Sequence, residues 1–136
     1  MTSPVPPTIA LRIPCSPEYV SVARLTISAV ASRMNFGIDD IDDLKLAVGE
    51  ACANAIEHAA EGDIDIICTM EPDQLVLSVK DCGIGFDPSA PRVEPAEEPP
   101  VGGLGLIIIQ ALMDDVQIHS DPQRGTEVRM VKRFQK

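Results

Sequence analysis

The sequence predicts an α+β fold of two layers, with helices on one face of a mixed, mostly antiparallel sheet. Two observations lead to this prediction. Short segments alternate apolar and polar residues, as half-buried strands do, while longer segments repeat apolar residues every three or four positions, as amphipathic helices do. The order of these segments is β-α-α-β-β, then a proline-rich stretch, then α-β-β, which favours one layer of helices over one sheet.

The length of 136 residues is typical of one domain, which is expected to span residues 8–136. Residues 1–7 contain three prolines and no charged side chain. This composition lacks the basic start and apolar stretch of a secretory signal, so a disordered lead-in is expected there.

The first predicted elements are a strand and a helix. Thr8–Pro14 alternates apolar with polar or small residues, which predicts a strand. Ser16 and Pro17 are the residue types typical of an N-cap and of the first helical position. The apolar residues that follow keep helical spacing up to Gly37, so a helix is expected over this stretch.

A second helix and a hairpin follow. Asp39 and Asp40 can cap a helix and complement its dipole, and a buried stripe then continues to about Gly62. The segments 64–70 and 75–79 alternate again, and the residues between them are typical of a turn. We expect a hairpin of two strands here.

The second half of the chain begins with a change of composition. The stretch from Cys82 to Gly103 is rich in proline and glutamate and poor in apolar residues, so it cannot be core. A loop of this length within one domain is usually functional, and we interpret residues 87–102 as a mobile lid. A helix over 104–113 and two strands, over 116–120 and 126–134, complete the prediction.

Composition limits the possible functions. The formal charge of −10 argues against a nucleic-acid binder, and no apolar run is long enough to cross a membrane. The basic residues near the C-terminus are expected to be a solvated strand edge and tail; they are Arg129, Lys132, Arg133 and Lys136. The four cysteines show no zinc-site spacing and are expected to be buried free thiols in a reducing cytosol; they are Cys15, Cys52, Cys68 and Cys82.

A first polar motif lies on the second predicted helix. Glu50, Asn54 and His58 are spaced by four residues, which places them near one helix face. The Asn54 amide oxygen, with nucleotide phosphates, is a plausible ligand set for Mg²⁺, and Glu50 could accept a proton during phosphoryl transfer. The pattern alone could equally be a solvated helix edge.

A second motif follows the hairpin. The strand reaches Asp81, and Gly83 and Gly85 complete a D-x-G-x-G pattern. A carboxylate fixed at a strand end can accept a hydrogen bond from the adenine amino group, and the glycines permit close approach of a ligand. A tight turn would explain the same residues, and the P-loop pattern and the context of a dinucleotide-binding motif are both absent from the sequence.

A third motif, Gly102–Leu106, stands where the proline-rich stretch meets a helix. A glycine-rich helix N-terminus offers N–H groups and a positive dipole end, so it can bind phosphate even in an acidic chain. A hinge for the lid would use the same glycines. A fourth motif, Arg124–Thr126, leads into the last strand, where the hydroxyl of Thr126 could reach the base side of a pocket.

In this order and spacing, the motifs resemble the N, G1 and G2 boxes and the closing Gly-Thr strand of the GHKL ATPases, which share the two-layer Bergerat fold with an ATP lid. Three details are similar to the sequences of the anti-sigma-factor serine kinases. They are the glutamate four residues before Asn54, the Asn-Ala-x-x-His ending and the sequence Met113-Asp114-Asp115. The resemblance implies that Glu50 is the catalytic base and that Asn54 holds Mg²⁺. It implies that ATP is bound by Asn54, Asp81, Gly83, Gly85, Gly103, Leu104, Gly105 and Thr126.

The resemblance also implies an activity. Proteins of this kind are cytoplasmic homodimers that bind Mg-ATP, sequester a sigma factor and phosphorylate a serine or threonine of a STAS-type anti-anti-sigma antagonist. The lid departs from the family pattern, because it is short and Arg92 is its only basic residue. A non-catalytic, nucleotide-gated protein-binding module of the same fold is therefore the alternative. A two-component histidine kinase would need a phospho-accepting histidine on a separate helix, and neither His58 nor His119 lies on one.

Overall fold

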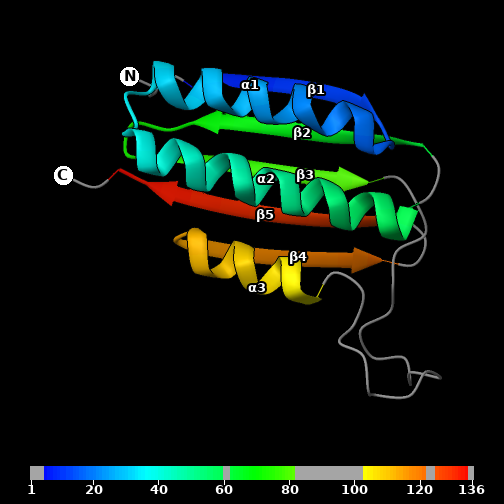
Figure 1. Cartoon of the computed structure of the whole chain (residues 1–136). Coiled ribbons are helices and arrows are strands. Elements are labelled where there is room, and N and C mark those ends of the chain that lie inside the picture. The colour runs from blue at the N-terminus through cyan, green and yellow to red at the C-terminus, as the bar shows by residue number, and fades with distance from the viewer. Residues whose placement is uncertain (1–4, 60–61, 82–102, 122–124, 135–136) are drawn as a thin grey trace.

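The computed structural model describes residues 5–59, 62–81, 103–121 and 125–134. Within them, three helices cover one face of a five-stranded sheet in two layers (Figure 1). A short 3₁₀ helix, Pro17–Tyr19, precedes the first α-helix. The elements in chain order are β1 (Thr8–Pro14), α1 (Val20–Arg33), α2 (Ile38–Ala59), β2 (Asp63–Met70), β3 (Gln74–Asp81), α3 (Gly103–Leu112), β4 (Asp115–Asp121) and β5 (Gly125–Arg133).

The sheet has the strand order β1-β2-β3-β5-β4, and all four of these pairings are antiparallel. The α+β class and the two layers are confirmed. The expectation of a mixed sheet is wrong for the described strands. β3 and β4 run in the same direction, but β5 lies between them and pairs with both, so no parallel pair forms.

The core lies between the sheet and the helices. Strand residues at alternate positions point toward the helices, and α2 presents small residues that allow the layers to approach closely. The fully buried side chains include Ile27, Leu44, Ala47, Val48, Cys52, Ile64, Ile66, Cys68, Leu75, Leu77, Ile109 and Met130. No helix in the described part of the chain combines the length and hydrophobicity that crossing a membrane requires.

The start and end of α1 differ from the sequence expectation. Ser16 is extended but makes no capping hydrogen bond through its side chain; its hydroxyl lies 3.3 Å from Oε1 of Glu18 instead. The helix ends before Gly37, because Asn35 adopts a φ of 65° and the N–H of Phe36 reaches back to the carbonyl of Ala31. This is a Schellman ending with asparagine in the left-handed position.

The C-terminal basic residues are not all solvated. β5 lies inside the sheet, and the Lys132 side chain is buried between α2 and α3, with 5% of the residue exposed. The expectation of a solvated strand edge is therefore wrong for Lys132. Its amino group pairs with Asp40, which lies within the first turn of α2 and does not cap it from outside. Lys136 lies outside the described residues.

Three cysteines lie in the described part of the chain and all three are free thiols, as expected. Cys52 and Cys68 are buried, and Cys15 is half-buried. Burial raises the pKa of Cys52 to about 12, with a smaller contribution from Cys15, and raises that of Cys68 to about 11. Cys82 is outside the described residues.

Candidate active site

One half of the candidate site lies where β3 ends beside the start of β5. Asp81 is the last residue of β3 and is buried, with 3% exposed. Its Oδ1 accepts a hydrogen bond from the backbone N–H of Thr126 at 3.2 Å. The hydroxyls of Thr126 and Ser120, which face each other across β4 and β5, lie 2.9 Å apart. The carboxylate is therefore held in a fixed orientation.

Gly125 makes this arrangement possible. Its φ is +94°, and a Cβ placed on it would lie 2.2 Å from the backbone oxygen of Asp81 and 2.8 Å from Oδ1. Only glycine fits at such a distance from another backbone. The sequence predicts that Gly125 belongs to a turn, whereas in the structure it is the first residue of β5, and a glycine within a strand often marks a close backbone approach.

The other half of the candidate site lies between α2 and α3. Glu50 and Asn54 are half-buried on α2, one turn apart. A Cβ placed on Gly105 of α3 would lie 3.0 Å from Oε2 of Glu50 and 3.7 Å from Oδ1 of Asn54. The structure thus brings Glu50, Asn54 and Gly105 together, although they come from different motifs. His58 is half-buried one further turn along α2.

The N-terminus of α3 lies at this second cluster. α3 starts at Gly103, so Gly105 is its third residue, and Leu104 is 66% exposed. The first N–H groups of a helix have no partner within it, and the dipole makes this end positive. This end of α3 can therefore accept anionic groups. Gly83, Gly85, Gly102 and the proposed lid at 87–102 lie outside the described residues.

Cys15 packs beside α2. Its thiol lies 3.8 Å from the carbonyl oxygen of Ala55, the residue after Asn54 on α2. Burial raises the pKa of Cys15, and the negative charges of Asp81 and Asp63 raise it further. The sequence predicts a buried thiol here, whereas the thiol of Cys15 is half-buried.

The oxygen atoms of the second cluster suit a hard cation. Oε2 of Glu50 and Oδ1 of Asn54 lie within 4 Å of one point, the position that a Cβ on Gly105 would take. Among the residues that the structure describes, no group of three or more His, Cys, Asp or Glu side chains could hold a metal on its own. A magnesium ion would thus need further oxygens, which phosphates supply.

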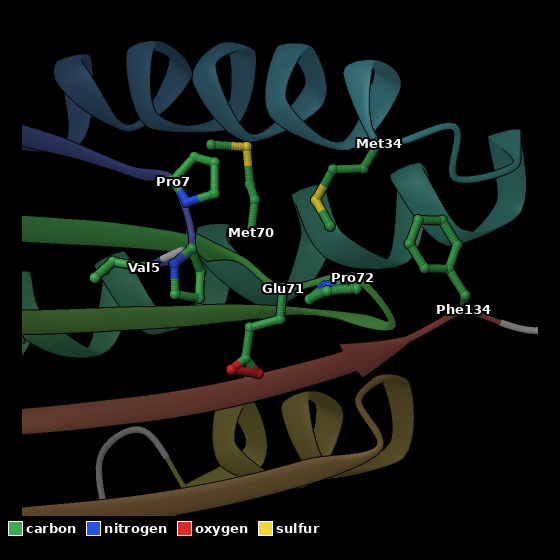
Figure 2. A pocket seen from close by; sticks show the side chains of 8 residues that line it. Val5, Pro7, Met34, Met70, Glu71, Pro72 and Phe134 are labelled. Carbon is green, nitrogen blue, oxygen red and sulfur yellow. The ribbon is translucent and has the colours of Figure 1, made fainter. Parts of the chain in front are cut away.

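A separate hollow of about 540 Å³ lies at the opposite end of the sheet, around the turn between β2 and β3 (Figure 2). It is lined mainly by methionine, proline and phenylalanine side chains, including Met34, Met70 and Phe134. None of the sequence-predicted site residues lines it.

Comparisons with known proteins show the family of this chain. A family model described as the histidine kinase-like ATPase domain matches residues 13–132. The serine-protein kinase RsbW of Bacillus cereus strain G9842 is 40% identical over 94% of this chain and 86% of its own length. The RsbW of strain Q1 is 41% identical over the same shares, and that of Bacillus mycoides is 40% identical.

Two solved structures share the fold. The first contains the RsbU and RsbW domains of a Mycobacterium tuberculosis protein, and it matches with a TM-score of 0.71 and 19% sequence identity. The match covers 93% of this chain and 32% of the Mycobacterium tuberculosis chain. The second is the histidine kinase domain of a blue-light activated histidine kinase of Erythrobacter litoralis, with a TM-score of 0.55 and 19% sequence identity. The match covers 98% of this chain and 65% of the Erythrobacter litoralis chain. The family expected from the motifs is confirmed, and the chain belongs to the histidine kinase-like ATPases and, within them, to the RsbW group of serine-protein kinases.

Proposed function

We propose that this chain is an anti-sigma factor that binds Mg-ATP, sequesters a sigma factor and phosphorylates a STAS-type anti-anti-sigma antagonist on serine or threonine. The observation that carries the proposal is the close approach of Gly105 to Glu50 and Asn54, whose side-chain oxygens would lie 3.0 and 3.7 Å from a Cβ on this glycine. A carboxylate and an amide oxygen lie there against the positive end of a helix, which is an arrangement suited to phosphoryl transfer.

The adenine would bind at Asp81. This carboxylate is buried and is oriented by the N–H of Thr126, so it can accept a hydrogen bond from the exocyclic amino group of the base. The hydroxyl of Thr126, paired with Ser120, would face the same end of the pocket.

The phosphates would bind at the start of α3. The whole chain carries a formal charge of −10, so side-chain cations are scarce. The N–H groups of Gly103, Leu104 and Gly105 offer partial positive charge without lysine or arginine. Asn54 would hold a magnesium ion through Oδ1, and the ion would neutralise charge on the phosphates.

Glu50 would act as the general base. Its carboxylate would take the proton from the antagonist hydroxyl while that oxygen forms a bond to the γ-phosphorus. The bond from the γ-phosphorus to the bridging oxygen of the β-phosphate breaks, and ADP leaves. The products are a phosphorylated antagonist and a protonated Glu50, which returns its proton to solvent.

The consequence would be a switch between two partners. The unphosphorylated antagonist would compete with the sigma factor, and phosphorylation would release the antagonist and restore inhibition of the sigma factor. We further propose that the protein acts in the cytoplasm as a homodimer, as the family resemblance implies.

Replacing Glu50 with glutamine tests the proposal. The variant should bind Mg-ATP with wild-type affinity in calorimetry, yet lose at least about 100-fold in the rate of phosphate transfer to a STAS-type antagonist from the same genome. Glu57→Gln is the matched control, since Glu57 lies on the same helix and its side chain is exposed. Full transfer by Glu50→Gln would remove Glu50 as the base.

The same assays on the wild-type protein distinguish the proposed kinase from the alternative function. If wild-type protein binds ATP and captures the sigma factor but never phosphorylates the antagonist, the chain is a non-catalytic, nucleotide-gated binding module. If wild-type protein does not bind ATP at all, both functions are excluded.

A further inference from the structure

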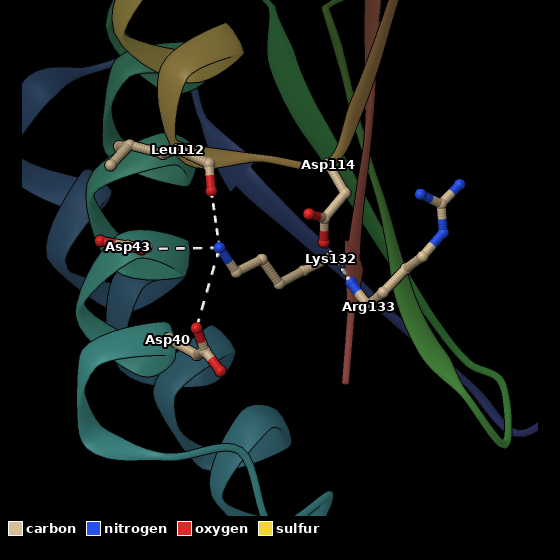
Figure 3. Close-up of polar contacts among 6 residues, drawn as sticks. All are labelled: Asp40, Asp43, Leu112, Asp114, Lys132 and Arg133. Carbon is tan, nitrogen blue, oxygen red and sulfur yellow. Dashed lines mark hydrogen bonds and ion pairs between the residues drawn. The ribbon is translucent and has the colours of Figure 1, made fainter. Parts of the chain in front are cut away.

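Lys132 joins three elements at the end of α3 remote from the candidate site (Figure 3). Its Nζ donates a hydrogen bond to the carbonyl of Leu112, the last residue of α3, at 2.7 Å. The same atom lies 3.5 Å from Oδ2 of Asp43 and 3.8 Å from Oδ1 of Asp40, both on α2. The lysine itself belongs to β5, so one ammonium group connects the sheet with both helices.

The charges explain why a cation is needed there. The C-terminus of a helix is negative, and α3 has no basic residue in its last turn. Asp40 and Asp43 add two carboxylates from the first turns of α2. Without Lys132, the carbonyl of Leu112 would face these carboxylates with no cation between them, which favours separation of the two helix ends.

The two contacts between α2 and α3 are in register. The helices run in opposite directions (Figure 1), with Asp43 near Leu112 at one end and Glu50 near Gly105 at the other. Seven residues separate Asp43 from Glu50, and seven separate Gly105 from Leu112. Seven residues rise about 10.5 Å along a helix, so the contact at Lys132 and the contact at Gly105 are coupled through two rigid turns.

A second set of contacts holds the chain after α3 without the lysine side chain. Oδ2 of Asp114 accepts a hydrogen bond from the backbone N–H of Arg133 at 2.6 Å, and the N–H of Asp114 donates to the carbonyl of Val131 at 2.9 Å. Ile109 and Met113 are also buried against the core. These contacts should keep the domain folded when the ammonium group is lost, while the carbonyl of Leu112 loses its link to Asp40 and Asp43 of α2.

We propose that Lys132 is a positioning residue for phosphate binding: it fixes the register of α3 on α2, so that the N-terminus of α3 faces Glu50 and Asn54. It acts through Gly105 and does not touch the nucleotide. This inference rests on the proposed function, because it assigns the phosphates to that end of α3. It predicts that the phosphate contribution to binding depends on Lys132, while the adenine contribution, which comes from Asp81 on β3, does not.

The test compares ATP with adenosine as ligands in the presence of Mg²⁺. Lys132→Met should weaken ATP binding about tenfold, while the affinity for adenosine, measured by competition with a fluorescent nucleotide, stays within about twofold of wild type. Lys132→Arg keeps the cation and should restore most of the ATP affinity. Arg133→Met is the control, since Arg133 is the next residue of β5 and its side chain is exposed.

The outcomes are distinct. A purely structural role would lower ATP and adenosine affinity by the same factor in Lys132→Met, and this result would overturn the inference while leaving the proposed function intact. If Lys132→Met binds both ATP and adenosine with wild-type affinity, the inference is also overturned. If wild-type protein binds adenosine and ATP equally well, the phosphates are not bound at α3, and the proposed function fails together with the inference.

Amide hydrogen exchange supplies a readout that needs no nucleotide. The amides of residues 107–109, the first that can bond to carbonyls within α3, should exchange several-fold faster in Lys132→Met than in wild type, Lys132→Arg or Arg133→Met. Unchanged exchange at these amides in Lys132→Met would contradict the coupling between the two ends of α3.

Discussion

The backbone N–H of Thr126 donates a hydrogen bond to Oδ1 of Asp81 at 3.2 Å. Asp81 ends β3 and Thr126 is the second residue of β5, and these two strands pair with each other within the sheet. The proposed base end of the candidate site is therefore built on strands, while the proposed phosphate end is built on two helices. The two ends can be tested by separate substitutions.

Asp81→Asn should weaken ATP binding roughly 10- to 100-fold, since a lost hydrogen bond to a buried group costs about 1–3 kcal/mol. Asparagine can keep an acceptor for the N–H of Thr126, so the domain should remain folded. It places an amide donor in place of the second carboxylate oxygen, and this donor would face the amino group of adenine. Calorimetry measures the affinity, and an unchanged value would exclude Asp81 from the pocket.

Gly125→Ala should destabilise the domain by at least about 1–2 kcal/mol, because a side chain disfavours the positive φ of this residue. The added Cβ would also overlap the backbone of Asp81, which has no rotamer that could relieve the contact. Urea denaturation measures the loss.

Gly37→Ala is the control for this substitution. A Cβ on Gly37 has no heavy atom within 4 Å, so its effect should stay within about 0.5 kcal/mol. Equal unfolding midpoints for the two variants would contradict the close approach of Gly125 to Asp81.

Gly105→Ala should lower ATP affinity with little effect on stability. The new Cβ would lie 3.0 Å from Oε2 of Glu50, so this side chain must move away from the start of α3. Alanine is otherwise a better helix former than glycine by about 1 kcal/mol, which offsets the crowding. Calorimetry with Mg-ATP and a urea titration separate the two effects.

Gly49→Ala provides the matched comparison inside α2. A Cβ there would make an ordinary contact of 3.6 Å with Cδ of Arg24. This variant should be more stable than wild type by about 0.5–1 kcal/mol and should bind ATP normally. If Gly105→Ala also binds ATP normally, the contact between Gly105 and Glu50 has no role in the site.

Much of the fold could be predicted because alternation and helical spacing are local properties of the chain. The strand Thr8–Pro14 has the bounds expected from its alternation, and α3 differs from its expected range by one residue at each end. The order of strands in the sheet is not local. The insertion of β5 between β3 and β4, which removes the parallel pair, depends on packing that periodicity does not contain.

The candidate site was predicted from motifs, and the structure brings several of its residues together, but two contributions were missed. The sequence predicts a solvated Lys132 because clustered basic residues near a chain end usually face solvent, and the partners of Lys132, Asp40 and Asp43, lie about 90 residues away in the chain. Lys132 follows Val128 and Met130 at alternate positions of β5, so all three side chains point to the face of the sheet that the helices cover. This alternation could have indicated that Lys132 is buried. The contact of Gly125 with Asp81 likewise arises only when β3 and β5 pair.

The buried thiol of Cys52 predicts a loss of stability at alkaline pH. Burial raises its pKa from 9.0 to about 12 in the folded state, and Cys15 adds to the shift. The thiol of the unfolded chain therefore releases its proton near pH 9, whereas the folded chain retains it. A group with a raised folded pKa stabilises the fold fully below the unfolded pKa, and this contribution is lost as the pH rises from about 9 to about 12.

Cys52→Ala isolates this effect, because Cys68 and all other titrating groups remain in both proteins. At pH 7 the variant should be less stable than wild type, since it leaves a small cavity beside the fully buried residue 52. The difference in free energy of unfolding between the two proteins should shrink steadily when urea titrations are repeated between pH 9 and 11. A constant difference over this range would mean that Cys52 titrates equally in the folded and unfolded states.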